Sequence, residues 1–224
     1  PDSFIVYLPK DVVSGDFYWV YEDKKGVSYF AVGDCTGHGV SGAFMSIIGQ
    51  TLLNELVVNK GMTEVDEILM KMREYVIHYL GQKGEVGEAR DGMDMALCRL
   101  DSKQNKLSFA GAYNSLYLVR EGDLMELKGS RQPVGYLLGM DIPFDKEEIE
   151  IKKGDVLYLF SDGYADQFGG LKDKKFMFGK FKKLLLANAD KPMREQQNIL
   201  QKTMVEWIGD KEQIDDICVM GVRV

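Results

Sequence analysis

The chain is poor in the residues that bind soft metals or build disulfide frameworks. Its 224 residues include three cysteines and two histidines. Cys35, Cys98 and Cys218 are odd in number and far apart, which argues against both a disulfide framework and a thiolate zinc site. A reducing, cytoplasmic setting is therefore expected. With only His38 and His78 available, a histidine-rich site is excluded too, so any metal centre must use oxygen ligands.

Long apolar runs and an excess of positive charge are also missing. No apolar run approaches 18 residues, so we expect no membrane span. The net charge is −7, whereas nucleic-acid binders usually carry a basic face, so no nucleic-acid partner is expected. An acidic chain can still bind phosphate where metal ions supply positive charge locally.

The chain shows no internal repeat and no linker rich in proline or serine. Residues 1–224 are therefore predicted to form a single domain. Because the chain starts at Pro1 rather than Met, we expect this domain to be a fragment, C-terminal in position, of a longer protein.

Strand-like segments outnumber helical ones and follow one another in hairpins. Strands are predicted over residues 4–8, 17–21, 27–32, 95–100, 107–112, 116–120, 124–127, 149–151, 156–160 and 217–224. Helices are predicted over residues 44–56, 65–79, 176–186 and 193–207. Thr63 is a candidate N-cap of the second helix. Consecutive hairpins favour an antiparallel α+β architecture over a doubly wound parallel sheet.

Four aspartates stand at the ends of predicted strands. Asp16 opens a strand, Asp34 and Asp162 each close an apolar run, and Asp215 precedes the last strand. A strand that ends in Asp carries its carboxylate from the core to the rim of the sheet. Neighbouring glycines let backbone carbonyls approach a ligand there.

Carboxylates gathered at one rim would repel one another, and some would have to protonate. Divalent cations resolve this conflict, because Mg²⁺ and Mn²⁺ prefer oxygen ligands and two such ions can share a carboxylate and a water. A single strand-end Asp beside glycine is nevertheless more often a turn residue. Periodicity alone leaves both interpretations open for Asp34 and Asp162.

Six segments recur in an order typical of one enzyme family. They are residues 11–19 (DVVSGDFYW), 33–40 (GDCTGHGV), 42–46 (GAFMS), 109–112 (FAGA), 161–170 (SDGYADQFGG) and 215–216 (DD). In these segments the chain resembles the metal-dependent PPM/PP2C-type serine/threonine phosphatases, and most of all their bacterial SpoIIE-type branch.

The resemblance implies two stacked antiparallel β-sheets flanked by helix pairs, with two Mn²⁺ or Mg²⁺ ions at one end. It implies that Asp34 bridges the metals and that Cys35 lends its backbone carbonyl. Asp162 and Asp215 match the other direct ligands, and Asp16 matches a ligand that binds directly or through water. Asp34 and Asp162 are the residues on which catalysis is expected to depend most.

The implied reaction is hydrolysis of phosphoserine or phosphothreonine on a regulatory protein by a metal-bridging water. In this branch the usual substrate is a small anti-anti-sigma-like protein, and an upstream sensor domain lies in the same chain. A homodimer is also expected. The full-length protein could be membrane-anchored.

Three further residues are candidates for accessory roles. Asp91 and Asp94 lie near the position where some relatives bind a third metal, against the alternative of a solvated loop. His38 is a candidate general acid, against a purely structural role in its loop.

Two other functions remain open. The first is a phosphatase-like regulatory binding module with little activity, which the complete set of expected ligands argues against. The second is an aspartyl-phosphate or receiver-type domain, which would need alternating strand–helix units. The predicted hairpins between residues 95 and 127 argue against it.

Overall fold

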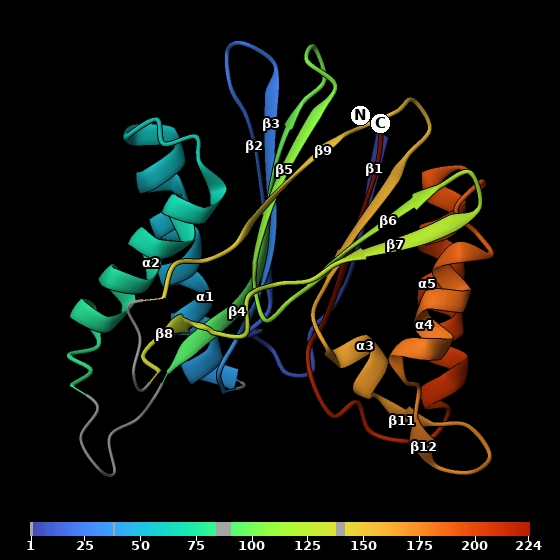
Figure 1. Cartoon of the computed structure of the whole chain (residues 1–224). Helices are drawn as coiled ribbons and strands as arrows, with labels where there is room; N and C mark the ends of the chain where they lie inside the picture. Colours follow the sequence, from blue (N-terminus) through green and yellow to red (C-terminus); the bar gives the residue numbers. More distant parts are fainter. Residues whose placement is uncertain (1, 38, 84–90, 138–141) are drawn as a thin grey trace.

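Two antiparallel β-sheets lie face to face, and helices cover the outer face of each sheet (Figure 1). The structure is a computed structural model that describes residues 2–37, 39–83, 91–137 and 142–224. Within these ranges every pairing between named strands is antiparallel. The arrangement confirms the predicted α+β class with two stacked sheets. Among the described residues the only parallel pairing is an isolated bridge between Ala112 and Ser130, whereas a receiver-type domain requires parallel strands.

The first sheet has five strands in the order β1-β13-β10-β6-β7. These are β1 (Asp2–Leu8), β13 (Ile217–Arg223), β10 (Val156–Phe160), β6 (Leu116–Arg120) and β7 (Asp123–Leu127). The second sheet follows the order β2-β3-β4-β5-β9, with the short β8 paired to β4. Its strands are β2 (Phe17–Glu22), β3 (Val27–Cys35), β4 (Gly92–Asp101), β5 (Lys106–Ala112), β9 (Lys146–Glu150) and β8 (Val134–Gly135).

Each sheet carries its own pair of long helices. The second sheet is covered by α1 (Gly39–Leu53), which continues into the π-helix η1 (Asn54–Asn59), and by α2 (Val65–Tyr79). The first sheet is covered by α4 (Phe178–Leu186) and α5 (Met193–Ile208). The short α3 (Gly163–Asp166) and the hairpin β11 (Phe168–Gly169) and β12 (Lys174–Lys175) follow β10.

The core has three layers because the central strands are apolar on both faces. In β3, Phe30 and Val32 pack between the sheets, whereas Tyr29 and Ala31 pack against the helices. Side chains alternate along a strand, so this continuous apolar run is what a strand buried on both faces needs. A third cluster, which includes Tyr158 and Phe181, lies between the first sheet and α4 and α5.

Several sequence expectations need correction. Thr63 is not the N-cap of α2: Glu64 holds that position without a side-chain capping bond, and the Thr63 hydroxyl instead lies 3.3 Å from the Glu64 carboxylate. The strand expected over 149–151 is β9, which begins at Lys146 because it pairs along β5. The brief α3 and the two-residue strands carry too little periodicity to be predicted.

One helical stretch, Gly39–Asn59, is long and apolar enough to pass for a membrane span by length and composition. Its residues Leu52, Leu53 and Leu56 are buried against the second sheet. Length and composition alone therefore do not distinguish this core helix from a membrane-spanning one.

The start of α3 is packed against β13 so closely that only glycine fits. A Cβ on Gly163 would lie 1.9 Å from the carbonyl oxygen of Asp216. We expect Gly163→Ala to lower the free energy of unfolding by about 2–3 kcal/mol, because the backbone must move apart. Gly179→Ala in α4 is the matched control: a Cβ there meets nothing within 4 Å, and alanine should raise helix stability by up to about 1 kcal/mol. Denaturant titration of both variants measures the difference, and equal stabilities would contradict the packing argument.

Candidate metal centre

Two aspartates face each other directly across β3 and β4. The strand register places Asp34 opposite Asp94. Both lie on the face that looks toward the other sheet, because Asp34 follows Phe30 and Val32 in the two-residue alternation. Like charges directly opposite each other destabilise a sheet unless something neutralises them.

The first sheet contributes Asp162, which directly follows Ser161 at the end of β10. The backbone N–H of Asp162 lies 3.5 Å from Oδ2 of Asp34 and donates to it. The carbonyl of Asp162 accepts the N–H groups of Ala165 and Asp166, which forms the turn of α3 and fixes the backbone at this point. The carboxylate-bearing ends of the two sheets therefore meet at one rim.

Asp16 is buried between these sheet ends and is held on several sides. Its carboxylate accepts a hydrogen bond from the Ser161 hydroxyl, whose oxygen in turn accepts the N–H of Cys218 at 3.0 Å. The backbone N–H of Asp16 donates to Ser14 Oγ at 3.0 Å, and its carbonyl accepts from the Tyr7 hydroxyl at 3.0 Å. Asp16 therefore has a fixed orientation before any ligand binds.

The two adjacent aspartates before β13 have different roles. Asp216 is buried, and its carboxylate accepts the backbone N–H groups of Lys10 and Gly15, both at 2.8 Å. Asp215 is exposed, and its Oδ1 accepts the N–H of Asp216 at 2.9 Å. Asp216 thus anchors the loop that carries Asp16, which leaves Asp215 as the carboxylate available to a ligand.

Glycines let the loops around these aspartates approach one another closely. A Cβ on Gly42 would lie 2.6 Å from the carbonyl oxygen of Gly37, and one on Gly15 would lie 2.9 Å from the same atom. The same Cβ on Gly15 would lie 3.4 Å from the carbonyl oxygen of Cys35. Gly37 itself has φ +83°, which disfavours other residues. The loop after Asp34 is thereby packed directly on the loop before Asp16.

Burial and mutual repulsion shift the acidity of these groups. Burial, and then the charges of Asp16 and Asp162, raise the pKa of Asp34 to about 9. Burial and the charges of Asp216 and Asp215 raise the pKa of Asp16 to about 8, against the Ser161 hydrogen bond. Burial and the charge of Asp162 raise the pKa of Asp94 to about 7. The pKa of Asp162 is also raised, by burial and by Asp215.

These residues fit a hard divalent cation by the chemistry of their donors. The set consists of carboxylate and carbonyl oxygens, which are the ligands that Mg²⁺ and Mn²⁺ prefer. Within the part of the chain that the structure describes, no three His, Cys, Asp or Glu side chains are already gathered around one point. Burial and the repulsion among these carboxylates, which raise their pKa values, oppose such a gathering.

The remaining predicted site residues fall in three different places. Cys35 is buried, and burial raises the pKa of its thiol well above the usual range, so only its carbonyl is suited to a ligand role. Asp91 lies beside the loop after Asp34, where its carboxylate is 3.2 Å from the Thr36 hydroxyl. Asp94 belongs to the rim itself. His38 lies outside the described residues.

Sequence reasoning missed three residues that position the site. Ser161 and Ser14 orient Asp16, and Asp216 anchors its loop. The available signal was their place beside the aspartates, in Ser14-Gly15-Asp16, Ser161-Asp162 and Asp215-Asp216. The positions of Asp215 and Asp216 in the sequence do not reveal which of the two carboxylates anchors a loop and which one is available to a ligand.

Comparisons with known proteins identify the family and the fold of the chain. Residues 24–224 match the family model described as Stage II sporulation protein E (SpoIIE). The SiaA-PP2C domain of Pseudomonas aeruginosa is 31% identical with a TM-score of 0.88, over 99% of this chain and 85% of that chain. A Bacillus subtilis SpoIIE structure containing the PP2C phosphatase domain is 18% identical with a TM-score of 0.75, over 100% of this chain and 63% of that chain.

A structure of RsbX in complex with magnesium is 14% identical with a TM-score of 0.68, over 99% of this chain and 94% of that chain. At that identity the likeness concerns the fold alone. No match was found among curated proteins.

The raised pKa values predict how stability depends on pH in the presence of a chelator. Between about pH 4 and pH 9 the folded chain binds more protons than the unfolded chain, whose carboxyls titrate near pH 4. The free energy of unfolding should therefore fall as pH rises through this window. Denaturant titrations at several pH values measure the slope. Asp34→Asn should make the free energy of unfolding depend less steeply on pH. Mg²⁺ should stabilise the protein more at the alkaline end of the window. A free energy of unfolding that rises with pH in chelator would contradict the raised pKa values.

The two adjacent aspartates should respond differently to substitution. Asp216→Ala leaves two backbone N–H groups without their charged acceptor and should lower the free energy of unfolding by about 3 kcal/mol. Asp215→Ala should change stability by less than about 0.5 kcal/mol while weakening Mn²⁺ binding. Denaturation in chelator and calorimetric titration with Mn²⁺ measure the two effects separately. If Asp215→Ala lowered stability and Asp216→Ala weakened only Mn²⁺ binding, the roles of the two aspartates would be the reverse of those given above.

Proposed function

The chain belongs to the SpoIIE family of PP2C-type phosphatases, and on that premise we propose that it hydrolyses phosphoserine and phosphothreonine on a regulatory protein with the help of divalent cations. One observation carries the proposal. Buried Asp16 and half-buried Asp34 and Asp94, at the end of the second sheet, meet the more exposed Asp162 of the first sheet at one rim, where burial and mutual repulsion raise their pKa values. Such clusters of strongly shifted groups mark functional sites more often than structural ones.

We propose for these residues the ligand roles that the family resemblance implies, and the contacts at the rim support them. Asp34 lies at the centre, since it faces Asp94 across the sheet and receives the N–H of Asp162 from the other sheet. Asp162 and the exposed Asp215 would complete the set, with the carbonyl of Cys35. Asp16 holds its orientation through Ser161 and binds directly or through water. Asp94, with Asp91 beside it, is a candidate for a third site.

Two Mn²⁺ or Mg²⁺ ions held there would supply the positive charge that neutralises a phosphoryl group and lowers the pKa of an attacking water. The chain's own contribution is to keep the carboxylates apart yet aligned. Ser161 orients Asp16, and Asp216 anchors the loop that carries it. The glycine contacts around Gly37 hold the loop after Asp34 close to the loop before Asp16, so that both loops could bind the same ions.

Neither the cysteines near the site nor Ser161 is suited to form a covalent phosphoenzyme. The thiols of Cys35 and Cys218 are buried with raised pKa values, so neither is a thiolate at neutral pH. The Ser161 hydroxyl is engaged between Asp16 and the N–H of Cys218. Direct attack by water is therefore the mechanism that these residues favour.

The proposal extends to the biological setting. An anti-anti-sigma-like phosphoprotein is the substrate class that the family implies, and an upstream sensor domain in the same chain would control activity. We place the domain in the cytoplasm and expect it to act as a homodimer. The competing proposal, a phosphatase-like binding module with little activity, is disfavoured because every expected ligand position is filled.

Phosphate release from phosphoserine and phosphothreonine peptides tests the proposal. Activity with Mn²⁺ should disappear in chelator, and Asp34→Asn and Asp162→Asn should each lower kcat/KM by about 100-fold or more, because each removes a carboxylate that would hold the cations on which transition-state stabilisation depends. Asp190→Asn, in the exposed loop between α4 and α5, is the matched control and should leave activity unchanged.

The outcomes separate the alternatives. Full activity in chelator, or in both site variants, would refute the proposal. Mn²⁺ binding without phosphate release would favour the binding module. A phosphoenzyme sensitive to hydroxylamine would indicate a covalent route instead.

A further inference from the structure

A charged cleft lies at the end of the second sheet opposite the candidate metal centre. Its volume is about 430 Å³. Its polar lining includes Lys25, Tyr29, Thr63, Arg99, Asp101 and Lys103. From Val27 to Asp34 the strand β3 advances seven residues, so the cleft and the metal centre are roughly 23 Å apart at about 3.3 Å per residue. The cleft is therefore separate from the proposed reaction site.

The cleft exists because the helical layer ends before the strands do. On β4, Met95 and Leu97 face the helices and belong to the apolar core, but the next two residues on that face are Arg99 and Asp101. The α2 helix begins only at Val65, and Thr63, just before it, forms part of the cleft wall. The outer face of the sheet thus changes from apolar to charged where it is no longer covered.

Both carboxylates in the cleft already serve the backbone of their own turns. Asp23 Oδ1 accepts the N–H groups of Lys25 at 2.7 Å and Val27 at 3.0 Å. Asp101 Oδ1 accepts the N–H groups of Lys103 at 3.2 Å and Gln104 at 3.1 Å. These contacts close the two hairpin turns and occupy one oxygen of each carboxylate, and the lining still holds three positive side chains, Lys25, Arg99 and Lys103, against the two negative ones.

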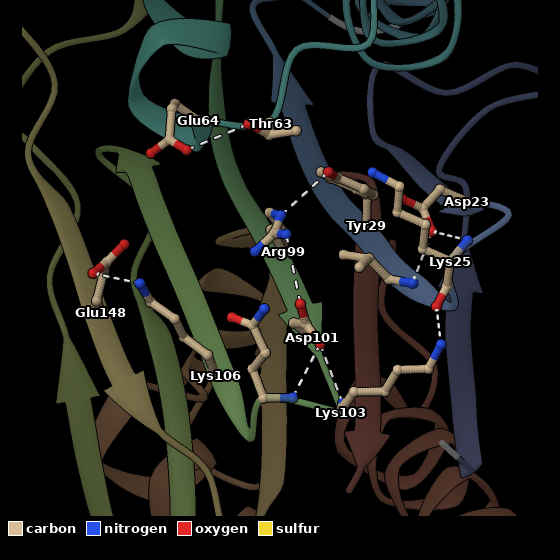
Figure 2. Close-up of polar contacts among 12 residues, drawn as sticks. Asp23, Lys25, Tyr29, Thr63, Glu64, Arg99, Asp101, Lys103, Lys106 and Glu148 are labelled. Atoms are coloured by element: carbon tan, nitrogen blue, oxygen red, sulfur yellow. Dashed lines mark hydrogen bonds and ion pairs between the residues drawn. The ribbon is translucent and has the colours of Figure 1, made fainter.

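The positive groups are held in place but keep donors to spare. Arg99 Nε donates to the hydroxyl of Tyr29 at 3.2 Å, and Nη2 lies 3.7 Å from Asp101 Oδ2 (Figure 2). Lys103 Nζ donates to the carbonyl of Lys25 at 2.7 Å, which ties one turn to the other. An arginine has five N–H donors and an ammonium group three, so each retains donors beyond these contacts.

We propose that this cleft binds a small phosphate-bearing anion. Arg99 would supply the planar fork that matches phosphate oxygens, and Lys103 and Lys25 would add charge from the two turns. The Thr63 hydroxyl stands on the facing wall. The tyrosine that lines the cleft, Tyr29, is itself buried and offers no open ring for stacking, so the phosphate rather than a nucleobase is the recognised group.

Two-dimensional amide NMR tests this proposal on the intact chain in chelator, so that metal ions do not attract phosphate to the other end. Inorganic phosphate and glycerol phosphate are the probes, with chloride at equal ionic strength as reference. We expect saturable shifts at the amides of residues 23–27, 63 and 101–104. Arg99→Gln should weaken binding by about tenfold, and Lys103→Gln by about threefold because exposed charges contribute less.

Lys24→Gln is the matched control, because Lys24 is exposed in the same turn but does not line the cleft. It removes the same charge and should leave the affinity unchanged. Equal weakening by Lys24→Gln and Lys103→Gln would overturn the proposal in favour of general electrostatic attraction. Shifts that do not saturate, or that centre on Asp34 and Asp162, would overturn it as well. Since Lys103 is exposed, its variant keeps the test decisive even if Arg99→Gln impairs folding.

Discussion

Negative charges brought together where two sheets end are the constraint on which the rest of this structure depends. Folding must hold Asp34, Asp94, Asp16 and Asp162 close to one another although burial and repulsion favour their separation or protonation. The sandwich meets this demand with a core that is apolar on both faces of its central strands. The hydrophobic layers thus stabilise an arrangement that the charges at their end oppose.

The contacts that hold the rim together cross from one sheet to the other. Ser161 at the end of β10 orients Asp16 at the start of β2, and the N–H of Asp162 reaches Asp34 on β3. Asp216 joins the start of β13 to the loop before β2. Each contact uses a backbone amide or a hydroxyl to stabilise a carboxylate, which leaves the outer oxygens of the rim for cations. Asp16 and its loop are thereby oriented before any ligand binds, whereas the other carboxylates of the rim still have to draw together around a cation.

Much of the fold could be predicted because continuous apolar runs indicate strands such as β3 and β10, and apolar residues at helical spacing indicate helices such as α2. The boundaries that failed were those set by partners distant in sequence: β9 extends to Lys146 because β5 pairs with it there. The strand-end aspartates were predictable as a group. Their separate roles were not, because Asp215 and Asp216 differ only in which contacts the tertiary structure gives them, and the polar cleft around Arg99 depends on where the helices stop.

The bond between Asp216 and the N–H of Gly15 joins positions 201 residues apart. Contacts of such separation form slowly, because the chain between them must be ordered first. During synthesis the loop that carries Asp16 lacks its Asp216 contact until the start of β13 has emerged, so a growing chain carries its first five motifs without this anchor. The proposed metal centre is thereby one of the last parts of the domain to assemble, and metal binding would report that the domain has folded.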